Sequence, residues 1–313
     1  MSENYPVILH HGLTSPFSEK IRIALGYKQL RWKSVVVPRV MPRPDLMPLT
    51  GGYRRTPTMQ IGADIYCDTQ MILHELDRRF PDPPLVPRHA SGITWGLLRW
   101  TDGAFFTDAM NLVLAENADH LPPEFVEDRE ALFGQAFDFA RMKSEIPFRR
   151  DQVRAQLAWI EDQLAAGGDW LMGEFSLADI HAYLNIWFCR NHSPRTAELL
   201  AAFPNILAWE SRMVAIGHGS REEIAAAEAL EIAASASPQA LAHDDPGELN
   251  GRRPGDRVSV TPYDYGCVPV SGEIVALSAN HIAIRRYDER AGDIVVHFPR
   301  VGFVIEVDDG ISR

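Results

Sequence analysis

A proline-rich segment at residues 81–87, Pro-Asp-Pro-Pro-Leu-Val-Pro, constrains the fold most strongly because it divides the chain. Proline lacks the backbone N–H that a helix interior or a central strand needs, so neither element continues across it. A second break covers residues 236–256, which are rich in Ala, Ser, Pro, Asp and Gly and show no sustained periodicity. We therefore expect three domains, at residues 1–84, 88–235 and 257–313, with a linker at 236–256.

The first part alternates between strand and helix signals. Apolar or β-branched runs indicate strands, and apolar residues at helical spacing indicate helices. The expected strands are 6–10, 32–37, 58–61 and 65–67, and the expected helices are 18–30 and 70–80. The order is β-α-β followed by β-β-α, and a right-handed crossover would make the first two strands parallel neighbours.

The second part reads as helix throughout. From residue 91 to about residue 234, apolar residues recur at helical spacing, which predicts an all-helical domain. The clearest local signal lies at Phe175 to Ile180, where Ser176 can cap a helix and Asp179 can reach back to the cap's N–H. Phe175 and Ile180 can pack together across that cap.

The third part changes to strand signals. Runs that alternate or carry β-branched residues lie at 257–260, 272–277, 281–286, 294–298 and 303–307. Turn residues separate them, which predicts a small all-β domain, a barrel or a sandwich. The expected fold class is therefore multidomain α+β.

Composition and charge narrow the function classes. The formal net charge of -11 opposes non-specific nucleic-acid binding. The three cysteines, Cys67, Cys189 and Cys267, are widely separated, which argues against a disulfide framework or a zinc site. His10 and His11 would point to opposite faces of a strand, so we expect no metal.

No apolar run approaches the roughly 18 residues of a membrane span. No export segment precedes the first strand, so we expect a cytoplasmic protein with no membrane contact and a small-molecule ligand.

Three successive motifs resemble those of soluble glutathione transferases: Ser15 to Leu25, Arg55-Thr56-Pro57, and Asp68-Thr69. Their order and spacing match that family, and the segment from Phe175 to Tyr183 resembles the helix start of its second domain. The resemblance covers about residues 5–220 and leaves the predicted β domain unexplained. It implies a thioredoxin-like first domain, glutathione as co-substrate and a homodimer.

Ser15 has two interpretations. It stands where the first strand passes to the first helix, and Pro16 suits the first helical position, so the hydroxyl can simply cap the helix. The resemblance to serine-type transferases, as in the zeta and theta classes, instead implies that the hydroxyl donates a hydrogen bond to the glutathione sulfur. A free thiol with a pKa of about 8.5 is only a few per cent ionised at neutral pH, so favouring the thiolate makes it reactive.

The same resemblance implies that glutathione is bound by Phe17, Arg55, Thr56, Pro57, Asp68 and Thr69. A cis peptide before Pro57 would expose the Thr56 backbone for strand-like pairing. The alternative is a trans proline that begins an edge strand.

The remaining assignments concern the two ends of glutathione. At a helix N-terminus, Thr69 would bind the γ-glutamyl carboxylate and Asp68 the neighbouring ammonium. Asp68 can equally be a helix cap. Arg55 would hold the glycyl carboxylate, or else be a solvated surface arginine. The family usually has Glu-Ser where this chain has Asp68-Thr69.

These expectations favour a glutathione transferase that activates the thiol for attack on a small hydrophobic electrophile, as in detoxification. The electrophile pocket should lie between the loop after Val37 and the helix that contains Trp100 and Phe105. One alternative is a glutathione-dependent peroxidase or reductase. Another is a non-catalytic scaffold whose β domain recruits a partner.

Overall fold

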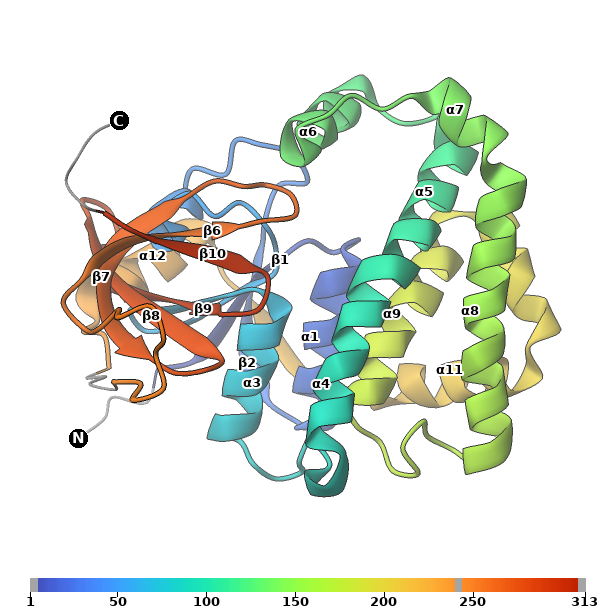
Figure 1. The fold of residues 1–313 in the computed structure, drawn as a ribbon, viewed down its shortest axis with the longest axis horizontal. Helices are drawn as coiled ribbons and strands as arrows, with labels where there is room; N and C mark the ends of the chain where they lie inside the picture. Colours follow the sequence, from blue (N-terminus) through green and yellow to red (C-terminus); the bar gives the residue numbers. More distant parts are fainter. Residues whose placement is uncertain (1–4, 240–243, 309–313) are drawn as a thin grey trace.

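The computed structural model describes residues 5–239 and 244–308, and the expected fold class is confirmed. Figure 1 shows strands gathered on one side of the molecule and a helical region on the other. The predicted linker at 236–256 lies partly outside the described residues. No single helix among the described residues has the length and apolarity of a membrane span. One bent pair, Arg195–Ala202 with Pro204–Ile216, meets that criterion only when its halves are taken together.

The N-terminal domain has the thioredoxin-like order. Its elements are β1 (Val7–His11), α1 (Pro16–Tyr27), β2 (Arg31–Val36), α2 (Met47–Thr50), β3 (Thr58–Ile61), β4 (Asp64–Cys67) and α3 (Thr69–Arg79). As expected, β1 pairs with β2 in parallel. The structure also shows that β3 runs antiparallel to both β1 and β4. The strand β1 is buried along its whole length, because α1 and α3 cover one face of the sheet and α12, described below, packs on the other.

Helices form the second part of the chain. They are η1 (Arg88–Ala90), α4 (Ser91–Arg99), η2 (Trp100–Phe105), α5 (Phe106–Asn117), α6 (Pro123–Phe133), α7 (Phe139–Ser144), α8 (Ile146–Gly167), α9 (Leu177–His192), α10 (Pro194–Glu198), η3 (Leu199–Ala202) and α11 (Pro204–Ile216). The capping box at the start of α9 is confirmed. The fully buried Asp179 carboxylate accepts from the N–H groups of Ser176 and Leu171 and from the Trp209 indole, so the cap also joins α9 to α11.

The expectation of helix as far as residue 234 is wrong at one place. After α11 the chain returns to the sheet as β5 (Ser220–Glu223), which pairs in parallel with β2, and then forms α12 (Ala226–Ser235). The four residues of β5 are all exposed and carry no apolar alternation. Backbone pairing with the free edge of β2 therefore makes this strand, and side-chain periodicity could not reveal it.

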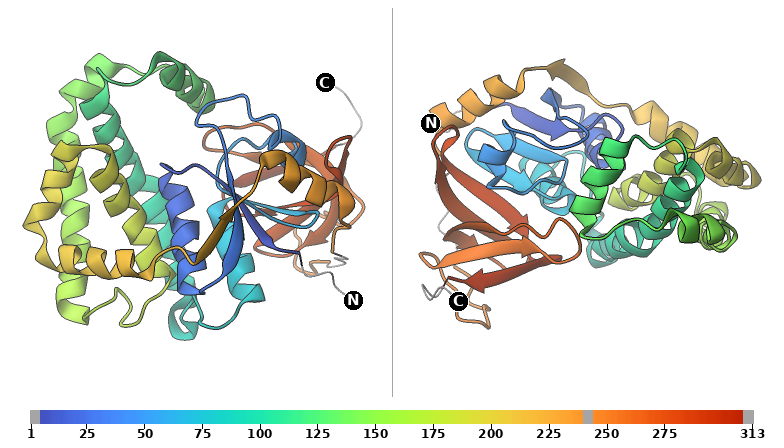
Figure 2. Two further views of the ribbon diagram at one scale, coloured as in Figure 1. Left: turned by 180° about the vertical axis from the view of Figure 1, so that it is seen from behind. Right: turned by 90° about the horizontal axis from the view of Figure 1, so that it is seen from above.

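The C-terminal region contains the five expected strands. They are β6 (Arg257–Pro262), β7 (Val270–Leu277), β8 (His281–Asp288), β9 (Gly292–Pro299) and β10 (Phe303–Val307). They extend the N-terminal sheet, which the barrel or sandwich interpretation did not foresee. Because β9 pairs in parallel with β4, the described strands form one sheet in the order β10-β6-β7-β8-β9-β4-β3-β1-β2-β5. Figure 2 shows the C-terminal strands, in orange and red, beside the blue N-terminal domain.

A shared apolar core explains why these strands do not stand apart. Leu49, Tyr53 and Ile65 of the N-terminal domain are buried in one cluster with Phe298 and Phe303. The Tyr53 ring lies 5.9 Å from that of Phe298. Separating the two regions would expose this cluster to water, so we expect them to fold as one unit.

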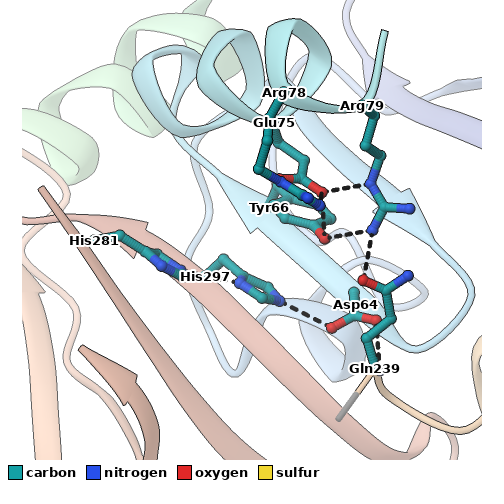
Figure 3. Close-up of polar contacts among 8 residues, drawn as sticks. All are labelled: Asp64, Tyr66, Glu75, Arg78, Arg79, Gln239, His281 and His297. Carbon is teal, nitrogen blue, oxygen red and sulfur yellow. Dashed lines mark hydrogen bonds and ion pairs between the residues drawn. The ribbon is translucent and has the colours of Figure 1, made fainter. Parts of the chain in front are cut away.

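Buried polar contacts line the seam between β4 and β9 (Figure 3). The Asp64 carboxylate accepts from His297 Nε2 at 2.9 Å and from the Gln239 N–H at 2.9 Å. A further hydrogen bond of 3.0 Å joins His297 Nδ1 to His281 Nε2. The His297 ring also stacks on Tyr66 at 4.3 Å, and Tyr66 donates to Glu75 of α3. The seam is therefore held by specific side-chain pairs as well as by backbone bonds.

We expect Asp64→Ala to lower the free energy of unfolding by about 3 kcal/mol, because it leaves the buried Nε2–H of His297 and the Gln239 N–H without their acceptor. The matched control is Asp293→Ala on β9, whose carboxylate forms an exposed pair with Arg285 and should cost about 1 kcal/mol or less. Urea denaturation measures both. Equal losses in the two variants would contradict a structural role for the buried carboxylate.

Acid should destabilise the fold through His10. Burial lowers the pKa of His10 from 6.5 to about 4, against a smaller opposite effect of its bond to Gln60. Between these values the unfolded chain binds a proton that the native state does not, so stability falls as pH falls below about 6.5. We expect His10→Gln to remove about 1 kcal/mol of the stability loss between pH 6 and pH 5. The exposed His89→Gln should leave that loss unchanged, and an identical pH dependence in both variants would refute the argument.

Candidate functional site

One cleft of about 1210 Å³ opens between the N-terminal domain, the helices and the loop after β6. The side chains that the sequence singled out come from three separate segments of the chain. All seven line this cleft: Ser15, Phe17, Arg55, Thr56, Pro57, Asp68 and Thr69. The fold therefore brings the predicted site together, while its ligand remains a prediction.

Ser15 caps α1, as one of its two interpretations requires. Its Oγ accepts from the Ser18 N–H at 3.2 Å, and Pro16 occupies the first turn. The hydroxyl hydrogen has no acceptor among the described residues, so it is available to a ligand in the cleft. The cap uses the oxygen lone pair and a donated bond would use the hydrogen, so the two roles are compatible.

The segment before β3 contributes a turn and a backbone edge. The Thr56–Pro57 peptide is cis, so the trans alternative is wrong.

Phe17 packs edge-on against Phe106 of α5 with ring centroids 4.8 Å apart, which joins the N-terminal wall of the cleft to the helical wall.

Asp68 and Thr69 stand at the start of α3. Asp68 is the N-cap, with its carboxylate accepting from the Gln70 N–H at 2.9 Å and its backbone at a φ of 75°. Few non-glycine residues adopt that conformation, which the surrounding structure must impose. Burial raises the pKa of the Asp68 carboxyl, although the Gln70 N–H and the Arg55 charge oppose the rise. The expected helix cap is confirmed.

Arg55 has partners that the sequence did not suggest. Its Nη2 donates to the Asp264 carboxylate and to the Tyr265 carbonyl, and its guanidinium lies 3.7 Å from the Tyr265 ring centroid. The side chain is only 10% exposed, so the solvated alternative is wrong. The Asp264 carboxylate therefore pairs with the arginine that was expected to hold the glycyl carboxylate of glutathione.

These partners belong to the β6–β7 loop, residues 263–269, which also contacts the helical region (Figure 1). Arg99 of α4 donates to the Tyr263 hydroxyl at 2.8 Å, and the Gly266 N–H donates to the Leu132 carbonyl at the end of α6 at 2.7 Å. Gly266 has a φ of +54°, and a Cβ there would lie 2.8 Å from the Leu132 side chain. The loop therefore ties both walls of the cleft together.

The helical wall differs in detail from the expected electrophile pocket. Phe105 is fully buried and stacks on Trp100 away from the cleft, while Phe106 and Met110 from the same helical tract line it. The lining is also rich in cations, which a net charge of -11 did not suggest. Its arginines are Arg39, Arg43, Arg54, Arg55, Arg99, Arg129, Arg141 and Arg149, against the acids Asp68, Asp102, Asp138, Glu145 and Asp264.

A resident metal has no evident ligands here. Within residues 5–239 and 244–308, no group of three or more His, Cys, Asp or Glu side chains is arranged to hold a metal ion.

Comparison with known proteins agrees with this architecture. Residues 9–84 match the family model of the glutathione S-transferase N-terminal domain, and residues 109–221 match a domain of unknown function (DUF7962). A GST-like protein from Pseudomonas syringae is 35% identical, with a TM-score of 0.81, over 97% of this chain and 99% of that one. The chain belongs to the glutathione S-transferase-like family.

Two other matches cover a smaller part of this chain. FtsZ-localized protein A from Caulobacter vibrioides is 28% identical over 180 residues, which is 56% of this chain and 73% of that protein. A glutathione S-transferase from Rhodospirillum rubrum, at 20% identity and a TM-score of 0.51, covers 66% of this chain and shares the fold alone. The likeness to the Pseudomonas protein therefore extends over the C-terminal strands, whereas these two matches are partial.

We expect Tyr265→Ala to loosen the β6–β7 loop, because the ring packs on the Arg55 guanidinium and lies 5.3 Å from Phe133. Amide hydrogen exchange across residues 263–269 should accelerate about tenfold, with β8 and β9 unchanged. The control is Tyr287→Ala on β8, whose side chain is 72% exposed. Unaltered exchange in the loop would mean that Tyr265 does not hold it.

Proposed function

We propose that the protein binds glutathione in this cleft, with the thiol at Ser15 and the γ-glutamyl end at the start of α3. The observation that supports the proposal is the convergence of all seven motif residues on one cleft. The N–H groups at the start of α3 and its dipole suit a carboxylate, and a ligand ammonium would pair with Asp68.

Two uses of bound glutathione are open to this geometry. The first is transferase catalysis, in which the free Ser15 hydrogen would donate to the sulfur and favour the thiolate. A small hydrophobic electrophile would then bind against Phe106 and Met110. A mixed disulfide with the protein at this place is ruled out, since both Ser15 and Ser18 lack sulfur.

The second use is non-catalytic binding, in which the fold presents a surface to a protein partner. The ion pair between Arg55 and Asp264 favours this non-catalytic use, because a ligand carboxylate would have to compete with the Asp264 carboxylate for the arginine. The name of the relative FtsZ-localized protein A also favours it, since that name describes a location and not a reaction. For either use we also propose a cytoplasmic homodimer, with the chain divided at residues 1–84, 88–235 and 257–313; the first and third of these parts share one sheet and one core.

Calorimetric titration with glutathione tests the common step. Saturable binding is expected, and Asp68→Ala should weaken it about tenfold or more by removing the partner of the ammonium group. The matched control is Asp288→Ala, because the Asp288 carboxylate also accepts from the N–H two residues on, that of Arg290, at 2.9 Å, but is not part of the cleft lining. An absence of heat at millimolar glutathione would defeat the proposal.

Turnover then separates the two uses. If the protein is a transferase, Ser15→Ala should lower kcat about a hundredfold with little change in glutathione affinity, and Ser15→Thr should restore much of the rate. Binding without turnover by the wild-type protein across a panel of electrophiles and peroxides would identify the non-catalytic use.

A further inference from the structure

Four arginines gather at one end of the cleft, where the loop after β2 meets α6. They are Arg39, Arg43, Arg54 and Arg129, here called the arginine cluster. All four line the cleft, and their charges repel one another, since Arg54 and Arg129 both lower the pKa of Arg43.

Among the described residues, Asp128 is the one carboxylate that forms ion pairs with the cluster, and it pairs with two of the four arginines. Asp128 accepts from Arg54 at 2.5 Å through Oδ1 and from Arg129 at 2.6 Å through Oδ2. The Met41 N–H also donates to Oδ1 at 2.9 Å. The side chain of Asp128 is 6% exposed, so it is already enclosed by these donors and has little capacity left for the other two arginines.

Arg43 is the most buried member of the cluster. It is 6% exposed and donates only to the backbone carbonyls of Pro38, Arg39 and Arg54. Burial, more than its cationic neighbours, lowers the pKa of Arg43 to about 10. A guanidinium enclosed in this way retains an unbalanced charge, which is costly away from water unless an anion is near.

Arg39 is exposed and forms no ion pair with any described residue. Its guanidinium lies 4.1 Å from the centroid of the Phe125 ring, and the Arg129 guanidinium lies 4.8 Å from the same ring. Stacking on Phe125 holds both groups in place while leaving the edge donors of Arg39 free. Four guanidinium groups against one carboxylate thus form an ordered site with spare donors for an anion.

Aromatic side chains also line the cleft, and one of them, Phe17, follows Ser15 by two residues. Phe106 packs on Phe17 at 4.8 Å and on Phe188 at 5.3 Å, and all three line the cleft. A ligand that fits this lining has an aromatic body and an anionic group.

We propose that the arginine cluster binds the anionic group of a second ligand, an aromatic carboxylate or phosphate, whose ring lies along this aromatic wall. The inference deepens the proposed function and rests on it for the place of glutathione, since it names the class of compound that shares the cleft. Carboxylates and phosphates both match the paired N–H donors of a guanidinium.

Equilibrium dialysis of the full-length protein with three matched nitroaromatic probes tests the inference. The probes are 4-nitrobenzoate, 4-nitrophenyl phosphate and uncharged nitrobenzene. We expect at least one anion to bind about tenfold more tightly than nitrobenzene, and the comparison of the two anions identifies the preferred class. Arg39→Gln should weaken binding of that anion about tenfold and leave nitrobenzene unchanged. Because Arg39 forms no ion pair, this change orphans no carboxylate. The matched control is Arg285→Gln on β8, which should alter neither.

The inference would be overturned by nitrobenzene binding as well as both anions, by an unchanged affinity in Arg39→Gln, or by displacement of the bound anion by saturating glutathione. Such displacement would mean that the cluster holds a carboxylate of glutathione itself. Glutathione binding without anion binding would defeat this inference alone. Anion binding that depends on Arg39, in a protein that ignores glutathione, would defeat the proposed function and leave the anion site standing.

Discussion

The parallel pairing of β4 with β9 is the contact on which the rest of the structure depends. Only three residue pairs form it, from Asp64 with Val295 to Tyr66 with His297. They turn β4 from an edge strand into an interior one, which buries Asp64 and His297 together. A buried carboxylate is tolerated there because the imidazole and a backbone N–H satisfy it. The burial of Tyr53 and Ile65 beneath the C-terminal strands adds the apolar part of the same contact.

This attachment decides the shape of the functional cleft. Once β9 is fixed to β4, the β6–β7 loop is held within reach of Arg55, Arg99 and Leu132. The cleft thereby gains a third wall from the C-terminal region, in addition to the two that the N-terminal domain and the helices supply. The same wall places Asp264 on Arg55, so the region that the family resemblance left unexplained acts directly on the predicted glutathione site.

Charge is distributed unevenly over the molecule. The chain as a whole is acidic, yet its cleft is lined by more arginines than carboxylates. Some of these charges are balanced within the protein, as Arg55 is by Asp264 and Arg149 is by Asp108. Those of Arg39 and Arg43 have no carboxylate of their own, and this surplus distinguishes one end of the cleft from the other. The anionic group of the proposed second ligand would balance this surplus charge.

Local sequence signals predicted many of the helices and strands of this protein. The prolines at 81–87 predicted a break in secondary structure, which lies between α3 and η1. The capping box at Ser176 and Asp179 and the alternation in the last five strands each predicted an element that the structure contains, because backbone constraints and periodic burial act over a few residues. The motif residues were likewise identifiable, and the cis peptide at Pro57 and the cap at Asp68 followed from them. The tertiary structure alone decided that β5 pairs with β2, that β9 pairs with β4, that Asp264 pairs with Arg55, and that Arg54 and Arg129 share Asp128. Each of these pairs residues from distant parts of the chain, and such pairing depends on which edges and charges the folded elements bring together, which no local pattern records.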